Sequence, residues 1–142
     1  MKYLKGFNES IGNSIESICK EYGIRNYIIN SDGSVDVDDD VYIPPTFFGQ
    51  PSNVVNLLKQ KLKSPGTEKL TTLPLKFGRV SGYFACSFNR LTSLEGCPQS
   101  VGEFFECGSN KLTSLQGGPQ SIGGAYFCNH NQIKDFKGVS EY

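Results

Sequence analysis

The chain has 142 residues, which favours one compact domain or two very small units. Hydrophobic residues make up 37% of it and charged residues 20%, a composition typical of globular proteins that argues against general disorder. The 14 basic side chains balance the 14 acidic ones and form no basic stripe, so we expect no nucleic-acid partner.

Targeting signals and cysteines bear on the cellular compartment. The N-terminal stretch MKYLKGFNES contains no apolar run of the length that a signal peptide needs. No stretch approaches the ~18 apolar residues of a membrane span. The five cysteines are an odd number, which fits reduced thiols better than a disulfide framework. We therefore expect a soluble cytoplasmic protein that does not contact a membrane.

The first predicted element is an amphipathic helix over residues 10–22. Apolar side chains recur there at spacings of three and four, which places them on one face of a helix, and Gly23 is a natural end point. The apolar positions are Ile11, Ile15, Ile18, Cys19 and Tyr22.

A β-hairpin and a further short strand are predicted next. Residues 26–30 are rich in β-forming residues, the sequence SDG turns the chain, and residues 34–37 alternate between polar and apolar. Residues 41–43 predict another short strand, which Pro44 and Pro45 end. The acidic residues here do not match a calcium loop, which needs a glycine at the sixth position and a glutamate at the twelfth, so we expect a solvated turn. They are Asp32, Asp36, Asp38, Asp39 and Asp40.

Residues 43–69 form a distinct connecting stretch. A second helix is predicted over residues 52–63, with Ser52 as its N-cap and Pro65 and Gly66 after its end. Before it, Phe47 and Phe48 lie in the Pro/Gly-rich loop IPPTFFGQPS. Two interpretations stay open for this aromatic pair, namely a binding loop or a plug that packs the N-terminal region onto the rest.

Residues 70–132 repeat with a period of 21. The rows are LTTLPLKFGRVSGYFACSFNR (70–90, repeat 1), LTSLEGCPQSVGEFFECGSNK (91–111, repeat 2) and LTSLQGGPQSIGGAYFCNHNQ (112–132, repeat 3), and IKDFKG starts a fourth. A fixed period of this length is typical of a solenoid whose coils stack. The shared columns are Leu70/Leu91/Leu112/Ile133, Leu73/Leu94/Leu115/Phe136, Val80/Val101/Ile122, Phe84/Phe105/Tyr126, Cys86/Cys107/Cys128 and Asn89/Asn110/Asn131.

The columns predict one short parallel strand in each repeat. Phe84 and Cys86 alternate with small or polar residues, so they face the core, and stacked coils would place equivalent strands about 4.8 Å apart. The Asn that follows is expected to bond to backbone of its turn and of the next coil, and to tolerate left-handed backbone. The leucines then point back into the core, and an extended return without a helix accounts for the short period.

These residues resemble the leucine-rich repeat, whose core reads L-x-x-L-x-L-x-x-N-x-L. The part F-x-C-x-x-N-x-L-x-x-L stands at Phe84, Phe105 and Tyr126, and the proline after the leucines resembles a short bacterial subtype. The Phe-x-Cys strand with LTSLEG-x-P is more similar to leucine-rich-repeat-like proteins of bacteriophages and large DNA viruses. The segment 27–37 also resembles the N-termini of those proteins. The resemblance covers about residues 15–42 and 70–138. It implies a binding scaffold.

We therefore expect an α/β fold consisting of a small leucine-rich-repeat solenoid of about three and a half coils. Residues 1–69 would form an α/β cap with an inserted helix in 43–69, residues 70–142 would form the solenoid, and the two would make one continuous unit. The low coil number and the 43–69 stretch depart from the family pattern. The C-terminal edge has Ile133, Phe136, Val139 and Tyr142 to cover it. Residues 133–142 could fold over this edge, or the edge could pair two copies, so monomer and homodimer both stay open.

The cysteine column and His130 could in principle form a metal site or a catalytic site, or could serve packing alone. Cys86, Cys107 and Cys128 with His130 suggest zinc ligands, but the cysteines share the phase of the buried phenylalanines and a straight row does not surround one ion. We expect no metal and no cofactor. His130 is the only histidine, and a strand surface offers it no oxyanion hole, so we expect no enzymatic activity.

The variable residues that alternate with the buried columns define a predicted concave binding face. They are rich in aromatic side chains, which are favoured anchors in protein interfaces. For Tyr83 and Phe104, packing onto the sheet is the alternative. The predicted partner-binding residues, including the 43–69 candidates, are Tyr83, Ser87, Phe88, Phe104, Glu106, Phe127, Asn129, His130, Phe47 and Phe48.

The function expected from this face is non-catalytic protein binding. The viral resemblance implies a phage-encoded inhibitor or modulator of a host protein, such as a defence or gene-expression factor, acting in the host cytoplasm. The alternative is a self-associating structural protein that uses the open solenoid edge.

Overall fold

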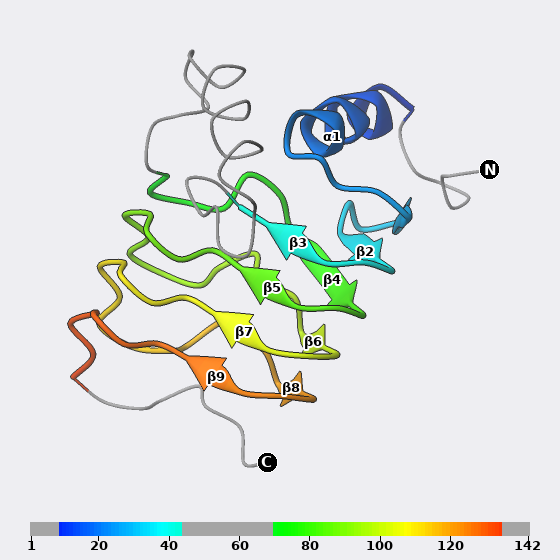
Figure 1. The fold of residues 1–142 in the computed structure, drawn as a ribbon. Helices are drawn as coiled ribbons and strands as arrows, with labels where there is room; N and C mark the ends of the chain where they lie inside the picture. The colour runs from blue at the N-terminus through cyan, green and yellow to red at the C-terminus, as the bar shows by residue number, and fades with distance from the viewer. Residues whose placement is uncertain (1–8, 44–69, 135–142) are drawn as a thin grey trace, which may run out of the picture.

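The computed structural model describes residues 9–43 and 70–134, which form a mixed α/β fold (Figure 1). Within these residues there are one helix and nine short strands, and the strands form two sheets. The second predicted helix, Phe47 and Phe48, and the C-terminal residues Phe136, Val139 and Tyr142 lie outside the described residues.

Helix α1 spans Glu9–Glu21, so the prediction of a helix over 10–22 is confirmed to within one residue at each end. Ile15 and Cys19 are buried, and Ile18 and Tyr22 pack against the same core. Gly23 ends the helix with φ 68°, and Ile24 N–H donates to the Cys19 carbonyl at 2.8 Å. A glycine with left-handed backbone, followed by a hydrogen bond that spans five residues, is the Schellman type of helix end.

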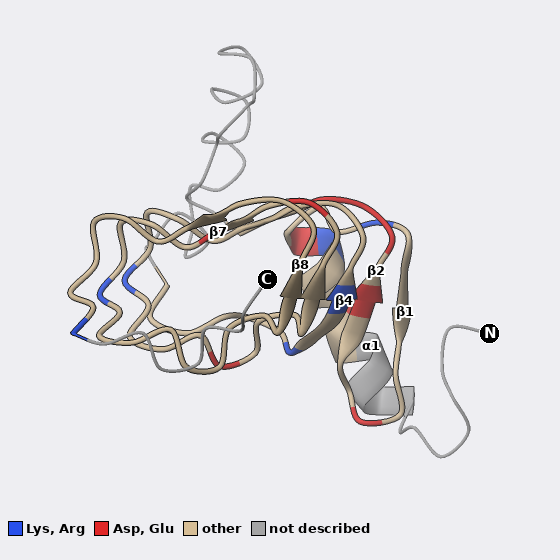
Figure 2. Cartoon of the chain, turned by 90° about the horizontal axis from the view of Figure 1, so that it is seen from below, with Lys and Arg blue, Asp and Glu red and all other residues tan. Residues whose placement is uncertain are grey.

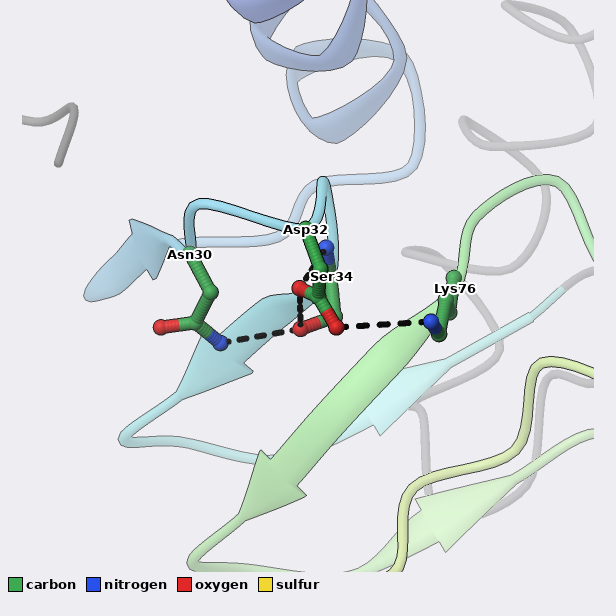
Figure 3. Close-up of polar contacts among 4 residues, drawn as sticks. All are labelled: Asn30, Asp32, Ser34 and Lys76. Atoms are coloured by element: carbon green, nitrogen blue, oxygen red, sulfur yellow. Dashed lines mark hydrogen bonds and ion pairs between the residues drawn. The ribbon is translucent and has the colours of Figure 1, made fainter. Parts of the chain in front are cut away.

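The predicted hairpin is confirmed as strands β1 (Tyr27–Ile29) and β2 (Val35–Val37), which pair antiparallel. In the turn, Asp32 Oδ1 accepts hydrogen bonds from Ser34 N at 2.9 Å and from Ser34 Oγ at 2.6 Å. Asn30 Nδ2 donates to Ser34 Oγ, and Lys76 Nζ lies 3.3 Å from Asp32 Oδ2 (Figure 3). The turn is therefore linked to the chain just before β4, the strand that pairs with β2.

The other strands alternate between the two sheets. The five-stranded sheet has the order β1-β2-β4-β6-β8 and the four-stranded sheet the order β3-β5-β7-β9, and every pair after the hairpin is parallel. Each 21-residue repeat supplies one strand to each sheet. The strands are β3 (Val41–Tyr42), β4 (Phe77–Val80), β5 (Phe84–Ala85), β6 (Ser100–Val101), β7 (Phe105–Glu106), β8 (Ser121–Ile122) and β9 (Tyr126–Phe127).

The strand register follows the sequence columns. Phe84 pairs with Phe105 and Phe105 with Tyr126, while Val80 pairs with Val101 and Val101 with Ile122. The segment around Phe84, Phe105 and Tyr126 was predicted as a strand in each repeat. The segment around Val80, Val101 and Ile122 was predicted as an extended return. In the structure it forms strands β4, β6 and β8, and each of them pairs with the equivalent strand of an adjacent repeat.

The core lies between the two sheets and the leucine turns. Phe84, Leu91, Leu94 and Leu112 are fully buried, as the repeat pattern predicted. Phe84 and Phe105 stack with ring centroids 5.7 Å apart and an interplanar angle of 11°. Each repeat thus covers the apolar side chains of the repeat before it, which a single repeat has no means to bury.

Strands β2 and β3 extend both sheets by one turn before repeat 1. Val41 pairs with Phe84, and acidic residues in β2 and in the turn between β2 and β3 bond to repeat 1. Arg79 N donates to Asp36 Oδ1 at 2.8 Å, and Tyr83 N donates to Asp40 Oδ1 at 3.1 Å. The acidic turn is therefore only partly solvated, because these carboxylates join the N-terminal region to the first repeat.

Candidate functional site

The exposed face of the four-stranded sheet continues into a hollow of about 1150 Å³ beyond the ends of β5, β7 and β9. Three successive turns of the chain form it, so its wall repeats with the same period as the sequence. Six of the predicted contact residues line it, namely Ser87, Phe88, Glu106, Phe127, Asn129 and His130.

Phe88 and Phe127 are the prominent side chains of the hollow. Their exposed fractions are 54% and 45%, and the only other exposed large hydrophobic side chain among the described residues is Ile28, at 51%. Ile28 belongs to β1 in the other sheet. Two of these three side chains therefore gather at the hollow, although nearby apolar columns are buried.

Backbone strain marks the same turns. Phe88, Ser109 and His130 occupy one column and have φ values of 61°, 53° and 58°. Left-handed backbone costs a non-glycine residue roughly 1–2 kcal/mol. The left-handed residue is thus the one before the Asn, not the Asn itself as the sequence suggested, and hydrogen bonds between repeats hold it: Phe88 N donates to the Gly108 carbonyl at 3.1 Å.

The Asn column fixes these turns. Asn110 Nδ2 donates to the Cys107 carbonyl at 3.0 Å and to the Cys86 carbonyl of the preceding repeat at 3.1 Å. Its Oδ1 accepts from Leu91 N at 3.0 Å. Asn131 repeats this pattern one repeat later. The prediction that Asn bonds to its own turn is confirmed, but its remaining bonds go to the start of its own repeat and to the preceding repeat, not to the next one.

A row of aromatic rings crosses the exposed face of the four-stranded sheet toward the hollow. Tyr83 stacks on Phe104 at a centroid distance of 5.1 Å, and Phe104 meets Phe127 edge-on at 6.0 Å. Tyr42 donates a hydrogen bond to Tyr83 Oη, and burial followed by this bond raises the pKa of Tyr42. Tyr83 and Phe104 are half-buried, so each ring packs against its neighbours and remains partly exposed.

The small residues of the predicted face are covered. Ser87, a predicted contact residue, and Ala85, which also alternates with the buried columns, are both buried. Ala85 lies in register between Tyr42 and Glu106, whose larger side chains flank it. Glu106 is half-buried, and burial raises the pKa of its carboxyl. Asn129 and His130 are exposed at the rim of the hollow.

The cysteines pack in the core. Cys86 and Cys107 are fully buried, and Cys128 is half-buried at the end of the row. A hydrogen bond with Cys97 and then burial raise the pKa of the Cys86 thiol, and burial raises that of Cys107. Because the thiolate is the nucleophile and the metal ligand, these shifts oppose both roles. Across residues 9–43 and 70–134, no group of His, Cys, Asp or Glu side chains is arranged to hold a metal ion.

Two basic residues of the hollow were not predicted. Arg90 and Lys111 line it from equivalent positions of repeats 1 and 2, directly after the Asn column. A basic residue recurring in one column next to variable aromatic residues was the signal that could have found them.

Comparisons with models of protein families, with curated proteins and with solved structures found no match to this chain. In the part of the chain that the structure describes, no helix has the length and apolar character to cross a membrane.

Proposed function

We propose that the chain is a short solenoid of the leucine-rich-repeat type that acts as a non-catalytic protein-binding scaffold. Binding would occur at the exposed face of the four-stranded sheet and its hollow. The observation that carries this proposal is the exposure of Phe88 and Phe127 beside an open hollow, in a molecule that otherwise buries its repeated apolar columns.

Solenoid architecture is supported by the match between sequence period and strand register. Residues one period apart pair in both sheets, and the Asn column bonds each turn to the one before it. The leucine-rich-repeat resemblance uses these same columns. In such a scaffold the buried columns maintain the fold, and the variable residues between them are free to form a recognition surface.

The exposed rings have the physical properties of interface anchors. Burying a phenylalanine side chain contributes about 1.5–3 kcal/mol, and anchors of this kind dominate binding energy in protein interfaces. Their backbone is held by bonds between repeats, so little ordering of these turns would oppose binding. Resemblance to phage-encoded proteins supports a host protein as the partner, such as a defence or gene-expression factor.

The test is capture of a partner from a bacterial lysate by the immobilised full-length chain. Phe88→Glu/Phe127→Glu should abolish capture, because charged side chains replace both anchors. Ile28→Glu is the control for each single substitution, since it places one glutamate on a comparably exposed position of β1, in the other sheet. Circular dichroism checks that all three proteins fold.

The outcomes of this capture experiment separate the candidate surfaces. A protein that the wild type and Ile28→Glu retain and the double variant loses would place the site on this face. A protein retained equally by all three would contradict the proposed face. Turnover of a substrate that His130→Ala abolishes would contradict the non-catalytic part of the proposal.

Self-association is the second candidate, and one observation favours it. Among the described residues, β8 and β9 pair only with the preceding strands β6 and β7, so the other edge of each sheet has no strand beside it. Light scattering over a range of concentrations tests this. A dimer that Ser121→Lys converts to a monomer would favour pairing through β8, because an edge lysine opposes strand addition. A monomer at all concentrations would exclude it.

A further inference from the structure

Basic residues lie at the turns that form the hollow. In Figure 2, blue segments mark the turns at one end of the molecule and red segments mark the bend that joins the two sheets, although a blue segment also lies on β4 and a red one on β2. Arg90 and Lys111 belong to the turns that line the hollow, and Asp38 and Asp39 lie between β2 and β3. The molecule as a whole is neutral, so the basic character of these turns is local.

The two basic side chains at the hollow have no acidic partner within the described chain. The turns that contain them, at residues 87–92 and 108–113, have no Asp or Glu. The ion pair between Lys76 and Asp32 lies elsewhere, at the β1–β2 turn, and no ion pair involves Arg90 or Lys111 within residues 9–43 and 70–134. Both are exposed and line the hollow, so an incoming acidic group can reach them without displacing another one.

We propose that the protein segment bound in the hollow is acidic and has an apolar side chain beside its acidic one. This inference rests on the proposed function and specifies the chemistry of the partner. The apolar side chain packs between Phe88 and Phe127, and the carboxylate lies over Arg90 and Lys111.

Geometry makes this pairing feasible. Equivalent backbone positions of adjacent repeats lie about 4.8 Å apart, so Arg90 and Lys111 can share one carboxylate or engage two that lie close together on the partner. An arginine can bind a carboxylate through two parallel hydrogen bonds. Glu106, which also lines the hollow, lies in strand β7, whereas Lys111 lies in the turn that follows that strand. The bound segment should therefore have its acidic residue at the turn end and no acidic residue over the strand.

Single-stranded nucleic acid is the competing class of macromolecule, because it also uses aromatic and basic side chains. It is disfavoured here for two reasons. The hollow has two basic residues, fewer than the series of phosphate contacts that gives nucleic-acid affinity, and Glu106 would repel a phosphate backbone.

The experiment selects short random peptides from a display library on the immobilised full-length chain. Binding of the selected peptides, made synthetically with a fluorescent label, is then measured by anisotropy. Labelled oligothymidylate is measured in parallel. Arg90→Glu/Lys111→Glu tests the basic pair, and Arg25→Glu/Arg79→Glu is the control with the same change in charge at exposed positions that do not line the hollow.

We expect enrichment of acidic peptides with an aromatic or aliphatic neighbour. Their affinity should fall by at least about tenfold in Arg90→Glu/Lys111→Glu and with added salt, and should change little in the control. Selected peptides that lack acidic residues, or that keep their affinity in Arg90→Glu/Lys111→Glu while losing it in Phe88→Glu/Phe127→Glu, would overturn this inference and leave the proposed function standing.

Two further outcomes contradict more than the charge preference. If no selected peptide depends on Phe88 and Phe127, both the inference and the proposed function fail. If oligothymidylate binds and the basic pair is required for it, the partner is a nucleic acid and the proposal of an acidic protein segment is wrong.

Discussion

The side-chain amide of Asn110 donates a hydrogen bond to the carbonyl oxygen of Cys86, 3.1 Å away and 24 residues earlier in the chain. The same amide group bonds to its own turn, and the Oδ1 atom accepts from Leu91 N. One buried side chain thus bonds to backbone groups of two adjacent repeats.

Asn110→Ala should lower the free energy of unfolding by about 1–3 kcal/mol. The substitution leaves the buried Leu91 N–H without its side-chain acceptor, a loss that costs about 1–3 kcal/mol. The carbonyls of Cys86 and Cys107 lose one side-chain donor each but still accept from Asn89 Nδ2 and Asn131 Nδ2. Urea unfolding measures the change. Asn129→Ala, at an exposed position, should cost less than about 0.5 kcal/mol. Equal effects at both positions would show that the buried bonds contribute little.

Phe88→Gly should raise the free energy of unfolding by about 1 kcal/mol while weakening partner binding. The backbone of Phe88 has φ 61° and its ring is mostly exposed, so glycine relieves strain and removes little packing. Phe127→Gly provides the contrast, because Phe127 lies in β9 and glycine weakens a strand. Thermal melts of both variants should shift in opposite directions. A loss of stability in Phe88→Gly would mean that the ring contributes more packing than its exposure suggests.

The sequence predicted those parts of the fold that repeat at a constant spacing. The buried columns at Phe84 and Leu91 recur at 21 residues, and the same residues are buried in the structure. Strands β4, β6 and β8 were predicted only as an extended return, because the Gly- and Pro-containing segments before β6 and β8 show no alternation of apolar residues. Their pairing depends on the adjacent repeat, and no single segment encodes it.

Strands β2 and β3 were predicted, but their parallel pairing with the strands of repeat 1 was missed, for a different reason. Their contacts with repeat 1 join residues 43 apart, as from Asp36 to Arg79, which is two periods plus one residue. Residues 44–69 lie between the two, so aligning rows of 21 residues does not bring these positions together. At the hollow, Phe88 and Phe127 followed from their variable, exposed positions. Burial of Ala85 depends on the neighbouring Tyr42 and Glu106 and is not visible in its own column.

Gly78→Ala should destabilise the protein by about 1–3 kcal/mol through a specific neighbour. A Cβ atom at this position would lie 2.1 Å from Asp36 Oδ1, the atom that accepts a hydrogen bond from Arg79 N. In an Asp36→Ala background the same glycine substitution should cost little, because the obstructing carboxylate is gone. A double-mutant cycle measured by urea unfolding should give a coupling of at least about 1 kcal/mol. Additive effects would instead mean that Asp36 swings aside at no cost.

The β1–β2 turn should respond to acid at unusually low pH. Hydrogen bonds from the Ser34 hydroxyl and N–H, with a smaller contribution from Lys76, lower the pKa of Asp32 to about 2. Because the folded pKa lies below the unfolded value of about 3.9, Asp32 stabilises the fold fully above pH ~4, and this contribution is lost as the pH falls through about 2. NMR titration of the Asp32 carboxyl carbon measures the pKa directly.

Ser34→Ala is the sharpest variant for this titration, because it removes the hydroxyl donor and keeps the backbone one. The pKa of Asp32 should move back toward its ordinary value, and the acid-induced loss of stability should begin at a higher pH. Lys76→Ala should produce a smaller change in the same direction, since the lysine is the lesser cause and its exposed pair is weakened by salt. A larger shift in Lys76→Ala than in Ser34→Ala would reverse this ranking and make the ion pair, rather than the turn, the main source of the low pKa.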